Sequence, residues 1–197
     1  MEHGTLTNNF LKSIAAGICI SIGCICYLSI ENKVIGALLF SVGLLAILTY
    51  GFNLYTGKIG LVKSLADIYN CIAYLIGNMY GCALTYGLMM MTPIYNNIQD
   101  KLLIIASNKL LIPLPELFIL GVICGILMLF ATKNKSNIVL TVFCVAVFIL
   151  IGAEHSVADS FYLLVCDDAF KCLEVVLTVA LGNATGAILM NKVIDMK

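Results

Sequence analysis

The stretch "GAEHSVADS", residues 152–160, decides how this sequence folds. An uncharged segment of 16 residues, 138–153, ends inside it, and Glu154, His155 and Asp159 then lie close together before the chain becomes apolar again. Sixteen residues make only about 24 Å of helix, whereas a helix needs about 20 apolar residues to span a bilayer. The stretch therefore predicts a membrane helix that breaks at its polar residues and then restarts.

The composition of the whole chain indicates a membrane protein. Of its 197 residues, 61% are hydrophobic and 11% are charged, whereas a soluble domain carries roughly 25% charged residues. So few polar side chains cannot cover the apolar surface in water, and we expect the lipid bilayer to be the solvent. The length predicts one transmembrane domain over residues 1–197, and the net charge of zero indicates no nucleic-acid partner.

Six membrane-spanning helices are predicted from the apolar runs. They cover residues 10–30, 34–57, 70–91 and 115–132, a fifth run that begins near 138, and residues 173–190. The second run ends in "YGFNLYTGKIG", residues 50–60, where glycines surround Asn53 and Thr56. This clustering predicts a second helix that breaks and restarts. The first span lacks a cleavage motif of small residues, and we expect it to be retained.

The third and sixth predicted spans share the pattern G-N-x-x-G, at residues 77–81 and 182–186. The order of helix, broken helix and G-N-x-x-G helix therefore occurs twice, over residues 9–92 and 110–192. A unit of three spans must invert its topology when it repeats. The sequence thus predicts an all-α membrane fold of two inverted three-helix repeats, and inverted repeats with paired broken helices are typical of transport proteins.

Asn78 and Asn183, the asparagines of this pattern, allow two interpretations. Small residues let helices approach closely and asparagine can bond across helices, so the pattern can serve packing alone. Its occurrence in both halves favours a structural role in the lining of a pore.

The breaks themselves predict a pore for a small anion. Irregular backbone at membrane depth persists only where it is buried in protein or lines a cavity, and freed helix N-termini favour negative charge. His155 is the candidate that exchanges a proton or donates a hydrogen bond there, with Glu154 to orient or balance it. The alternative is a histidine satisfied in a helix interface. Thr56 serves the permeating ion or merely caps the restarting helix.

Lysines supply the remaining candidates for anion binding. Lys109 precedes the fourth span, where a positive charge would raise the local anion concentration; Lys12 lies near the start of the first. Either side chain can instead extend to the membrane interface. All 11 basic residues are lysines, and the positive-inside rule predicts cytoplasmic termini. The predicted cytoplasmic lysines are Lys12, Lys58, Lys63, Lys133, Lys135, Lys192 and Lys197, and those on the other side are Lys33, Lys101, Lys109 and Lys171.

No metal, cofactor or enzymatic activity is expected. The second histidine is His3, and no cysteine and histidine cluster has the spacing of a metal site. Motifs of hydrolases, metalloproteases and nucleotide-binding loops are missing from the sequence. Most of the nine cysteines lie in apolar stretches and are expected to act as small hydrophobic residues. Cys166 and Cys172 flank a predicted loop, where a disulfide is one option.

The residues of both breaks resemble the formate/nitrite transporter family of pentameric anion channels. Residues 154–158, EHSVA, are similar to the E-H-S-x-A-N signature in that family's interrupted fifth span. Residues 54–57, LYTG, resemble its L-F-T-(S/G) loop in the second span, and residues 10–12 resemble its first-span entry. Asp159 stands where the family usually has asparagine, and Tyr55 where it usually has phenylalanine.

The resemblance implies an aquaporin-like fold, a homo-pentamer and roles for single residues. His155 would be the central pore histidine and Thr56 the threonine that faces it. Lys109 would be a vestibule lysine and Lys12 a lysine at the other mouth. The implied hydrophobic constriction consists of Phe40, Leu44, Leu54, Tyr55 and Phe148.

The predicted function is a membrane channel or transporter for small monovalent weak-acid anions, foremost formate, with proton-linked or histidine-assisted permeation across the cell membrane. Nitrite and hydrosulfide are alternatives within the same family. A water or neutral-solute channel is an alternative of another class, although the paired N-P-A motifs of water channels are missing. A membrane scaffold without transport is a third hypothesis, and it requires that His155→Ala leave every flux unchanged.

Overall fold

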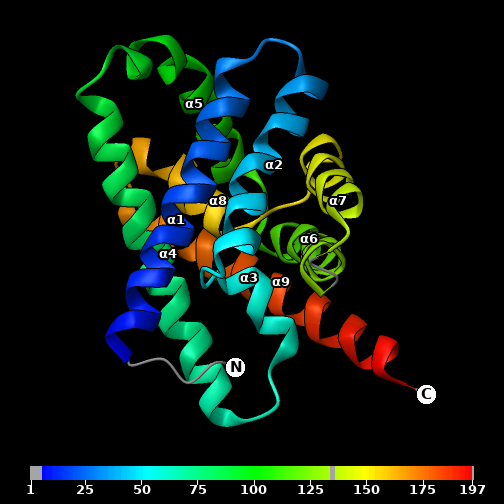
Figure 1. The fold of residues 1–197 in the computed structure, drawn as a ribbon. Coiled ribbons are helices and arrows are strands. Elements are labelled where there is room, and N and C mark those ends of the chain that lie inside the picture. The colour runs from blue at the N-terminus through cyan, green and yellow to red at the C-terminus, as the bar shows by residue number, and fades with distance from the viewer. Residues whose placement is uncertain (1–5, 134–135, 197) are drawn as a thin grey trace.

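The computed structural model describes residues 6–133 and 136–196, and these residues form helices joined by loops, without a strand among them (Figure 1). Lys135 and Lys197, which entered the orientation prediction, lie outside the described residues. The helices are α1 Leu6–Ser29, α2 Lys33–Tyr50, α3 Tyr55–Lys58, α4 Leu65–Met90, α5 Pro93–Leu111, α6 Leu114–Lys133, α7 Ile138–Leu150, α8 Ser156–Tyr162 and α9 Ala169–Asp195, with 3₁₀ turns at Ile59–Leu61 and Leu163–Val165.

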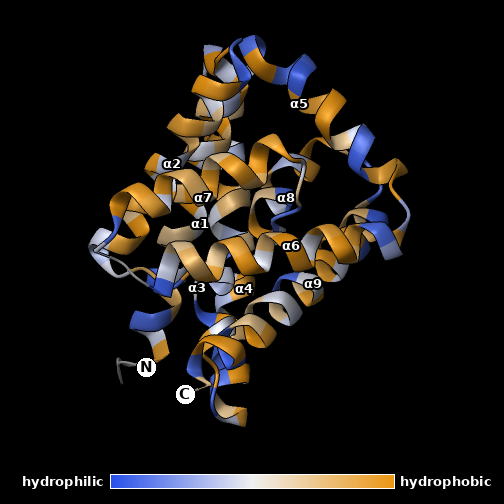
Figure 2. Cartoon of the chain, turned by 90° about the vertical axis from the view of Figure 1, so that its right-hand side faces the viewer, coloured by the Kyte–Doolittle hydropathy of each residue, from blue (hydrophilic) through white to orange (hydrophobic). Residues whose placement is uncertain are grey.

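The helices have the lengths and surfaces of a multi-pass membrane protein. Helices α1, α2, α4, α6 and α9 are each long and apolar enough to cross a bilayer. Figure 2 shows hydrophobic residues along most of the helical surfaces and hydrophilic residues gathered toward the helix ends. Large apolar side chains such as Phe143 and Leu181 are 59% and 64% exposed, which suits contact with lipid. The prediction of an all-α membrane fold is confirmed.

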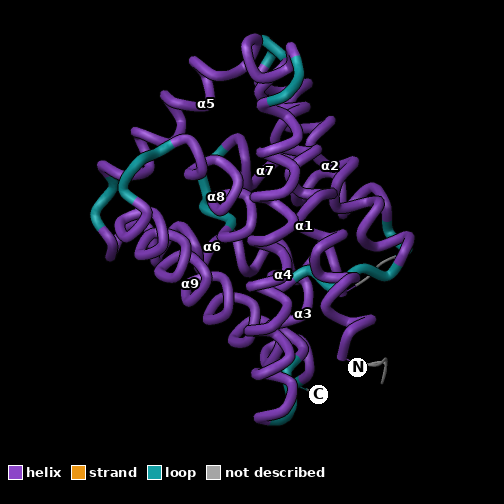
Figure 3. Tube along the Cα trace, turned by 90° about the vertical axis from the view of Figure 1, so that its left-hand side faces the viewer, coloured by secondary structure: helices purple, strands orange, loops and turns teal. Residues whose placement is uncertain are grey.

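Both predicted interruptions are confirmed, and they share one backbone geometry. Gly51 caps the end of α2 and Gly152 follows α7 closely, with φ of 68° and 74°, a conformation that glycine adopts without a steric penalty. The chain then runs extended to the restart at α3 or α8, as the loop segments in Figure 3 show. The amide of Asn53 donates to the Lys12 carbonyl at 3.3 Å, and the amide of Glu154 donates to the Leu120 carbonyl at the same distance.

Each half packs its helices in the same way. Helix α1 packs against α4 and α2, and α6 packs against α9 and α7, while α2 and α7 join the halves. The glycines of the G-N-x-x-G motifs permit these close approaches. A Cβ at Gly81 would lie 2.2 Å from the Ile14 carbonyl oxygen, and one at Gly186 would lie 2.0 Å from that of Val122. The corresponding contacts in both halves are those expected of repeated units.

Helix α5, between the halves, was not predicted from the sequence. It starts with Pro93 in its first turn, where the fixed φ of proline suits a helix. Ile98, Leu102 and Ala106 are buried along one side, and this four-residue spacing is the signal that indicates it. Its last turn carries Lys109, so α5 determines where this lysine lies.

The start of α1 and the end of α9 lie at the same end of the molecule, which is the lower end in Figure 1. Three lysines that were predicted to be cytoplasmic, Lys58, Lys63 and Lys133, line one surface cavity together with Asp195 near the end of α9. The ammonium of Lys133 lies 2.6 Å from an Asp195 carboxylate oxygen. This common side agrees with the predicted placement of both termini, and their cytoplasmic orientation stays a prediction.

Candidate functional site

The two breaks meet at Thr56 and His155. Thr56 lies in the first turn of α3, and His155 directly precedes α8. The Thr56 Oγ1 atom lies 2.8 Å from Nε2 of His155, and the two residues are 1% and 2% exposed. The structure therefore brings together the histidine and the threonine that the sequence singled out, one from each half.

The hydrogen bonds of the imidazole ring determine where its proton lies. Nδ1 of His155 accepts from the backbone N–H of Ala158 at 3.1 Å, so Nδ1 carries no proton. A neutral ring then holds its proton on Nε2, and Nε2–H donates to the Thr56 hydroxyl oxygen. The hydroxyl hydrogen of Thr56 is left to donate in another direction. His155 thus caps α8 and aims its own donor at the opposite half.

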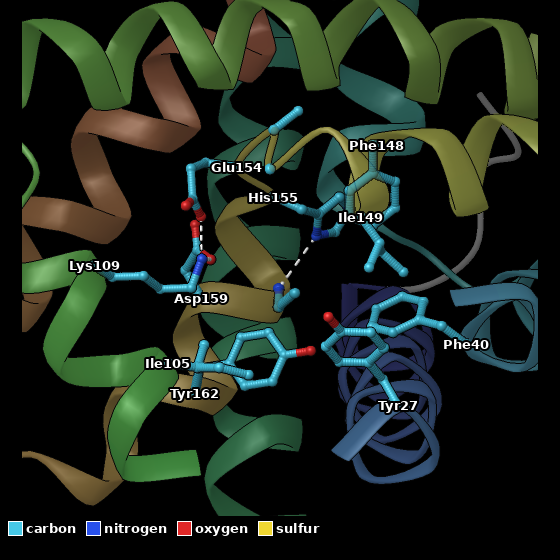
Figure 4. A pocket seen from close by; sticks show the side chains of 13 residues that line it. Tyr27, Phe40, Ile105, Lys109, Phe148, Ile149, Glu154, His155, Asp159 and Tyr162 are labelled. Atoms are coloured by element: carbon cyan, nitrogen blue, oxygen red, sulfur yellow. Dashed lines mark hydrogen bonds and ion pairs between the residues drawn. The ribbon is translucent and has the colours of Figure 1, made fainter. Parts of the chain in front are cut away.

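A cavity of about 140 Å³ lies beside this contact, on the side of Lys109 of α5 (Figure 4). His155, Phe148 and Phe40 form part of its wall. Phe148 stacks on the His155 ring with centroids 5.6 Å apart, and Phe40 meets Phe148 edge to face at 5.8 Å. The other lining residues are Tyr27, Ile105, Lys109, Ile149, Gly152, Ala153, Glu154, Ala158, Asp159 and Tyr162.

A second cavity of about 60 Å³ lies on the other side of the breaks. Leu54 and Gly57, which flank Thr56 closely in sequence, line it, and so does Ile47 of α2. Along α2, Phe40 borders the first cavity, Ile47 borders the second, and Leu44, 1% exposed, lies between them. A zone of apolar side chains therefore separates two cavities, and the Thr56–His155 contact lies within this zone.

Asn78 and Asn183 bind the broken backbone in corresponding ways. Oδ1 of Asn78 accepts from the amide of Tyr55 at 2.9 Å, and its Nδ2 donates to the carbonyls of Asn53 and Ser13 at 3.0 and 2.7 Å. In the other half, Oδ1 of Asn183 accepts from the Ser156 amide at 3.0 Å, and its Nδ2 donates to the carbonyls of Glu154 and Gly121 at 2.9 Å each.

Both asparagine side chains are fully buried and are not among the residues that line the two cavities. Their amides bind the N–H and C=O groups that the breaks leave without helical partners, which would otherwise be costly to bury. The motif thus combines close glycine packing with support of the breaks, and the asparagines lie behind the pore wall.

Lys109 lies in the wall of the larger cavity and faces two carboxylates. Its ammonium donates to Glu154, and it lies 2.8 Å from Oδ1 of Asp159. Its Nζ also lies 5.6 Å from the centre of the Tyr162 ring, within the range of a cation–π contact. The positive charge predicted for a vestibule is present, and it is paired with Glu154 and Asp159.

Two predicted residues lie away from the described cavities. Lys12 is half-buried on α1, and its carbonyl binds Asn53 at the first break; its side chain is not among the lining residues of either cavity. Tyr55, expected in the constriction, directs its hydroxyl toward α9, where it donates to the Ala180 carbonyl at 3.0 Å.

The sequence reasoning did not single out Tyr27, Ile105 and Tyr162, which line the larger cavity. Tyr162 lies three residues after Asp159 on α8, so helical spacing places them on one face. Tyr27 and Ile105 come from α1 and α5, and no local pattern marks them. Among residues 6–133 and 136–196, no group of three metal-ligating side chains is found.

Comparison with known proteins agrees with this architecture. The sequence model described as formate/nitrite transporter matches residues 2–196. One solved structure, titled "Pentameric formate channel with formate bound", superposes with a TM-score of 0.83 at 20% identity, over 95% of this chain and 94% of that chain. Another, titled "FNT family ion channel", gives 0.83 at 19% identity, over 96% and 90%. A comparison with curated protein sequences gives no match.

The low identities make these two likenesses evidence of the fold, whereas the family match extends over nearly the whole chain. Together with the paired helix breaks and the apolar spans, that match shows that this chain belongs to the formate/nitrite transporter family.

Proposed function

We propose that this membrane protein conducts small monovalent weak-acid anions, with formate as the first candidate and nitrite and hydrosulfide as alternatives. The observation that carries the proposal is the Thr56–His155 contact of 2.8 Å between two cavities. It provides polar donors inside an otherwise apolar barrier. One similar structure carries formate in its title, and this supports the choice of formate.

The larger cavity suits an anion of a few atoms. A water molecule takes a share of about 30 Å³ in the liquid, so a cavity of about 140 Å³ admits a small ion with some of its hydration. The Lys109 ammonium lies in its wall, where it is paired with Glu154 and Asp159. The side chains of Phe40 and Phe148 close the inner end, where an anion would lose its water.

The barrier favours a species that is close to neutral. An isolated ion in an apolar zone is strongly disfavoured, whereas a weak acid that gains a proton or a strong hydrogen bond has a lower barrier. The Thr56 hydroxyl and the Nε2 side of His155 lie where such a donor is required. This is histidine-assisted permeation, whether the proton crosses with the anion or returns to the ring.

We further propose that the chain assembles as a homo-pentamer in the cell membrane with both termini in the cytoplasm. One similar structure is titled as pentameric. Exposed apolar residues on several helices leave large surfaces for lipid and neighbouring copies. The mass of the detergent-solubilised complex tests the pentamer directly.

Stopped-flow uptake into proteoliposomes tests the function. Formate, nitrite and hydrosulfide are compared across a range of pH for the wild type, His155→Ala and Thr56→Ala, with empty vesicles as the baseline. We expect uptake well above the baseline in the wild type and a loss of at least about tenfold in His155→Ala. Equal rates in loaded and empty vesicles for every anion would refute the proposal.

The same vesicles distinguish the alternative classes. Swelling in water or glycerol that is unaffected by His155→Ala would indicate a neutral-solute channel. Anion uptake that remains unchanged in His155→Ala would instead place the permeation path elsewhere in the protein.

A further inference from the structure

The wall of the larger cavity holds one cation between two acids. Figure 4 shows the side chains of Lys109, Glu154 and Asp159 converging on one point. Their side chains are 12%, 7% and 1% exposed. Lys109 comes from α5, Glu154 from the second break and Asp159 from α8. The cluster is therefore almost entirely removed from solvent.

The charges of this cluster do not balance when all three groups are ionised. One ammonium and two carboxylates leave a net charge of −1 in a buried site. An uncompensated buried charge is strongly unfavourable, and such a group commonly becomes neutral by binding a proton. Two carboxyl groups that share one site also titrate as a pair. One proton on the pair makes the cluster neutral.

The geometry assigns that proton to Asp159. The Lys109 ammonium forms a hydrogen bond with Glu154, which is what an ionised carboxylate requires. Its contact with Oδ1 of Asp159, at 2.8 Å, is an ion pair without hydrogen-bond geometry. Neither carboxyl oxygen of Asp159 has a hydrogen-bond partner among the described residues. A buried carboxylate that accepts no well-aligned hydrogen bond is unfavourable, whereas a carboxylic acid supplies a donor of its own.

The other groups that face Asp159 do not supply the missing charge. His155 lines the same cavity, but its Nε2 is engaged with Thr56 and its Nδ1 with Ala158. Among the described residues around the cluster, Lys109 is the lysine that touches it. The remaining titratable groups nearby are Cys24 and Tyr27 of α1, Cys124 of α6 and Tyr162 of α8.

We propose that Asp159 holds a proton, so that the cluster of Lys109, Glu154 and Asp159 in the cavity wall is neutral toward the permeating anion. This role is distinct from that of His155 and rests on the proposed anion permeation for the identity of the ligand. Both carboxyl oxygens of Asp159 are buried, so the proton stays inside the cluster. Ionised Asp159 would restore a net negative charge beside the cavity, which repels the anion.

Substitutions at Asp159 test the charge of the cluster. Asp159→Asn keeps the shape of the side chain and stays neutral at every pH, and Asp167→Asn removes an exposed acid that follows the second restart. At acidic pH we expect formate uptake of Asp159→Asn and Asp167→Asn within about twofold of the wild type. A loss of about tenfold or more in Asp159→Asn alone would show that an ionised carboxylate is required and would overturn the neutral cluster.

The protonation of formate changes with pH in the same way for every variant. The ratio of uptake between two variants at each pH therefore reports the ionisation of Asp159 alone. As Asp159 ionises, wild-type uptake should fall relative to Asp159→Asn by about tenfold for each unit of pH. A ratio that rises with pH would contradict the proposal.

Infrared difference spectroscopy of the purified protein detects the proton on Asp159 without a transport assay. The carbonyl stretch of a protonated carboxyl group should be present in the wild type and in Asp167→Asn at neutral pH, and lost in Asp159→Asn. An identical band in all three proteins would refute the protonated Asp159. If no variant, including the wild type, moved any anion, the proposed function would fail, while the infrared result would still decide the state of Asp159.

Discussion

The hydroxyl oxygen of Thr56 lies 2.8 Å from Nε2 of His155, although 99 positions separate the two residues in the sequence. One residue belongs to the restart in the first half and the other to the restart in the second. The contact places a donor and an acceptor between two cavities. The consequences of this arrangement can be tested by substitution.

Thr56→Val should impair transport while the fold persists. Valine has nearly the shape of threonine but removes the oxygen that accepts from Nε2–H, which leaves a buried donor without a partner at a cost of about 1–3 kcal/mol. We expect formate uptake to fall by about tenfold or more. Thr56→Ser, which keeps the oxygen, should retain most of the rate. Similar rates for both variants would show that the hydroxyl is dispensable.

Asn183→Ala and Asn78→Ala should each destabilise the protein strongly. Each asparagine makes three buried hydrogen bonds to the backbone at its break. At about 1 kcal/mol for each bond, with more for groups left unpaired, we expect a loss of at least about 3 kcal/mol. Thermal unfolding in detergent measures it, with Asn97→Ala on the exposed side of α5 as the matched control. Equal midpoints for the three variants would contradict this role.

Gly125→Ala should disrupt the packing of α6 on α9. A Cβ at Gly125 would lie 2.1 Å from the carbonyl oxygen of Asn183, so the two backbones would have to separate and carry Asn183 away from the break. Gly87→Ala in α4 is the control, because a Cβ there meets nothing within 4 Å. It should instead stabilise its helix by up to about 1 kcal/mol. The sign of the change in unfolding midpoint distinguishes the two positions.

Phe40→Ala should relax selectivity by size. The Phe40 ring packs edge to face on Phe148, with centroids 5.8 Å apart, at the inner end of the larger cavity. Its removal should widen the barrier and cost about 3–5 kcal/mol of stability. We expect the ratio of acetate to formate uptake to rise relative to the wild type. An unchanged ratio in a folded variant would place the narrowest point elsewhere.

Lys109→Met should destabilise the protein unless an acid is neutralised with it. Removing one partner of a buried ion pair typically costs about 3–5 kcal/mol, and here the Glu154 carboxylate loses its cation. Adding Glu154→Gln to Lys109→Met should recover much of the unfolding midpoint. A double variant as unstable as the sum of the single variants would show that the groups act independently.

The sequence predicted the breaks well because their signals are local. Glycine and polar residues within apolar runs mark the ends of α2 and α7, and the resemblance paired Thr56 with His155 before any geometry was known. Helix α5 was missed because its polar residues at 96–101 interrupt the apolar pattern, and its buried stripe became evident from the packing.

Long-range contacts account for the remaining differences. The sequence could mark Asn78 and Asn183 as a repeated pair, but their partners come from two other segments in each half, a neighbouring helix and the break itself. Likewise, the pairing of Lys109 with Asp159 depends on the course of α5. Tyr55 was placed in the constriction from its position in the motif, while its hydroxyl in fact binds α9.

Nδ1 of His155 caps α8 by accepting from the Ala158 amide, and this affects how the ring can exchange protons. A histidine that carries protons from one side of a membrane to the other must bind and release them at both nitrogens. Here one nitrogen is occupied for as long as α8 keeps its cap. If His155 acts in permeation as proposed, it would exchange protons through one nitrogen only, and a proton given to a passing anion would return through the same Nε2. The ring would then assist permeation without relaying protons across the membrane.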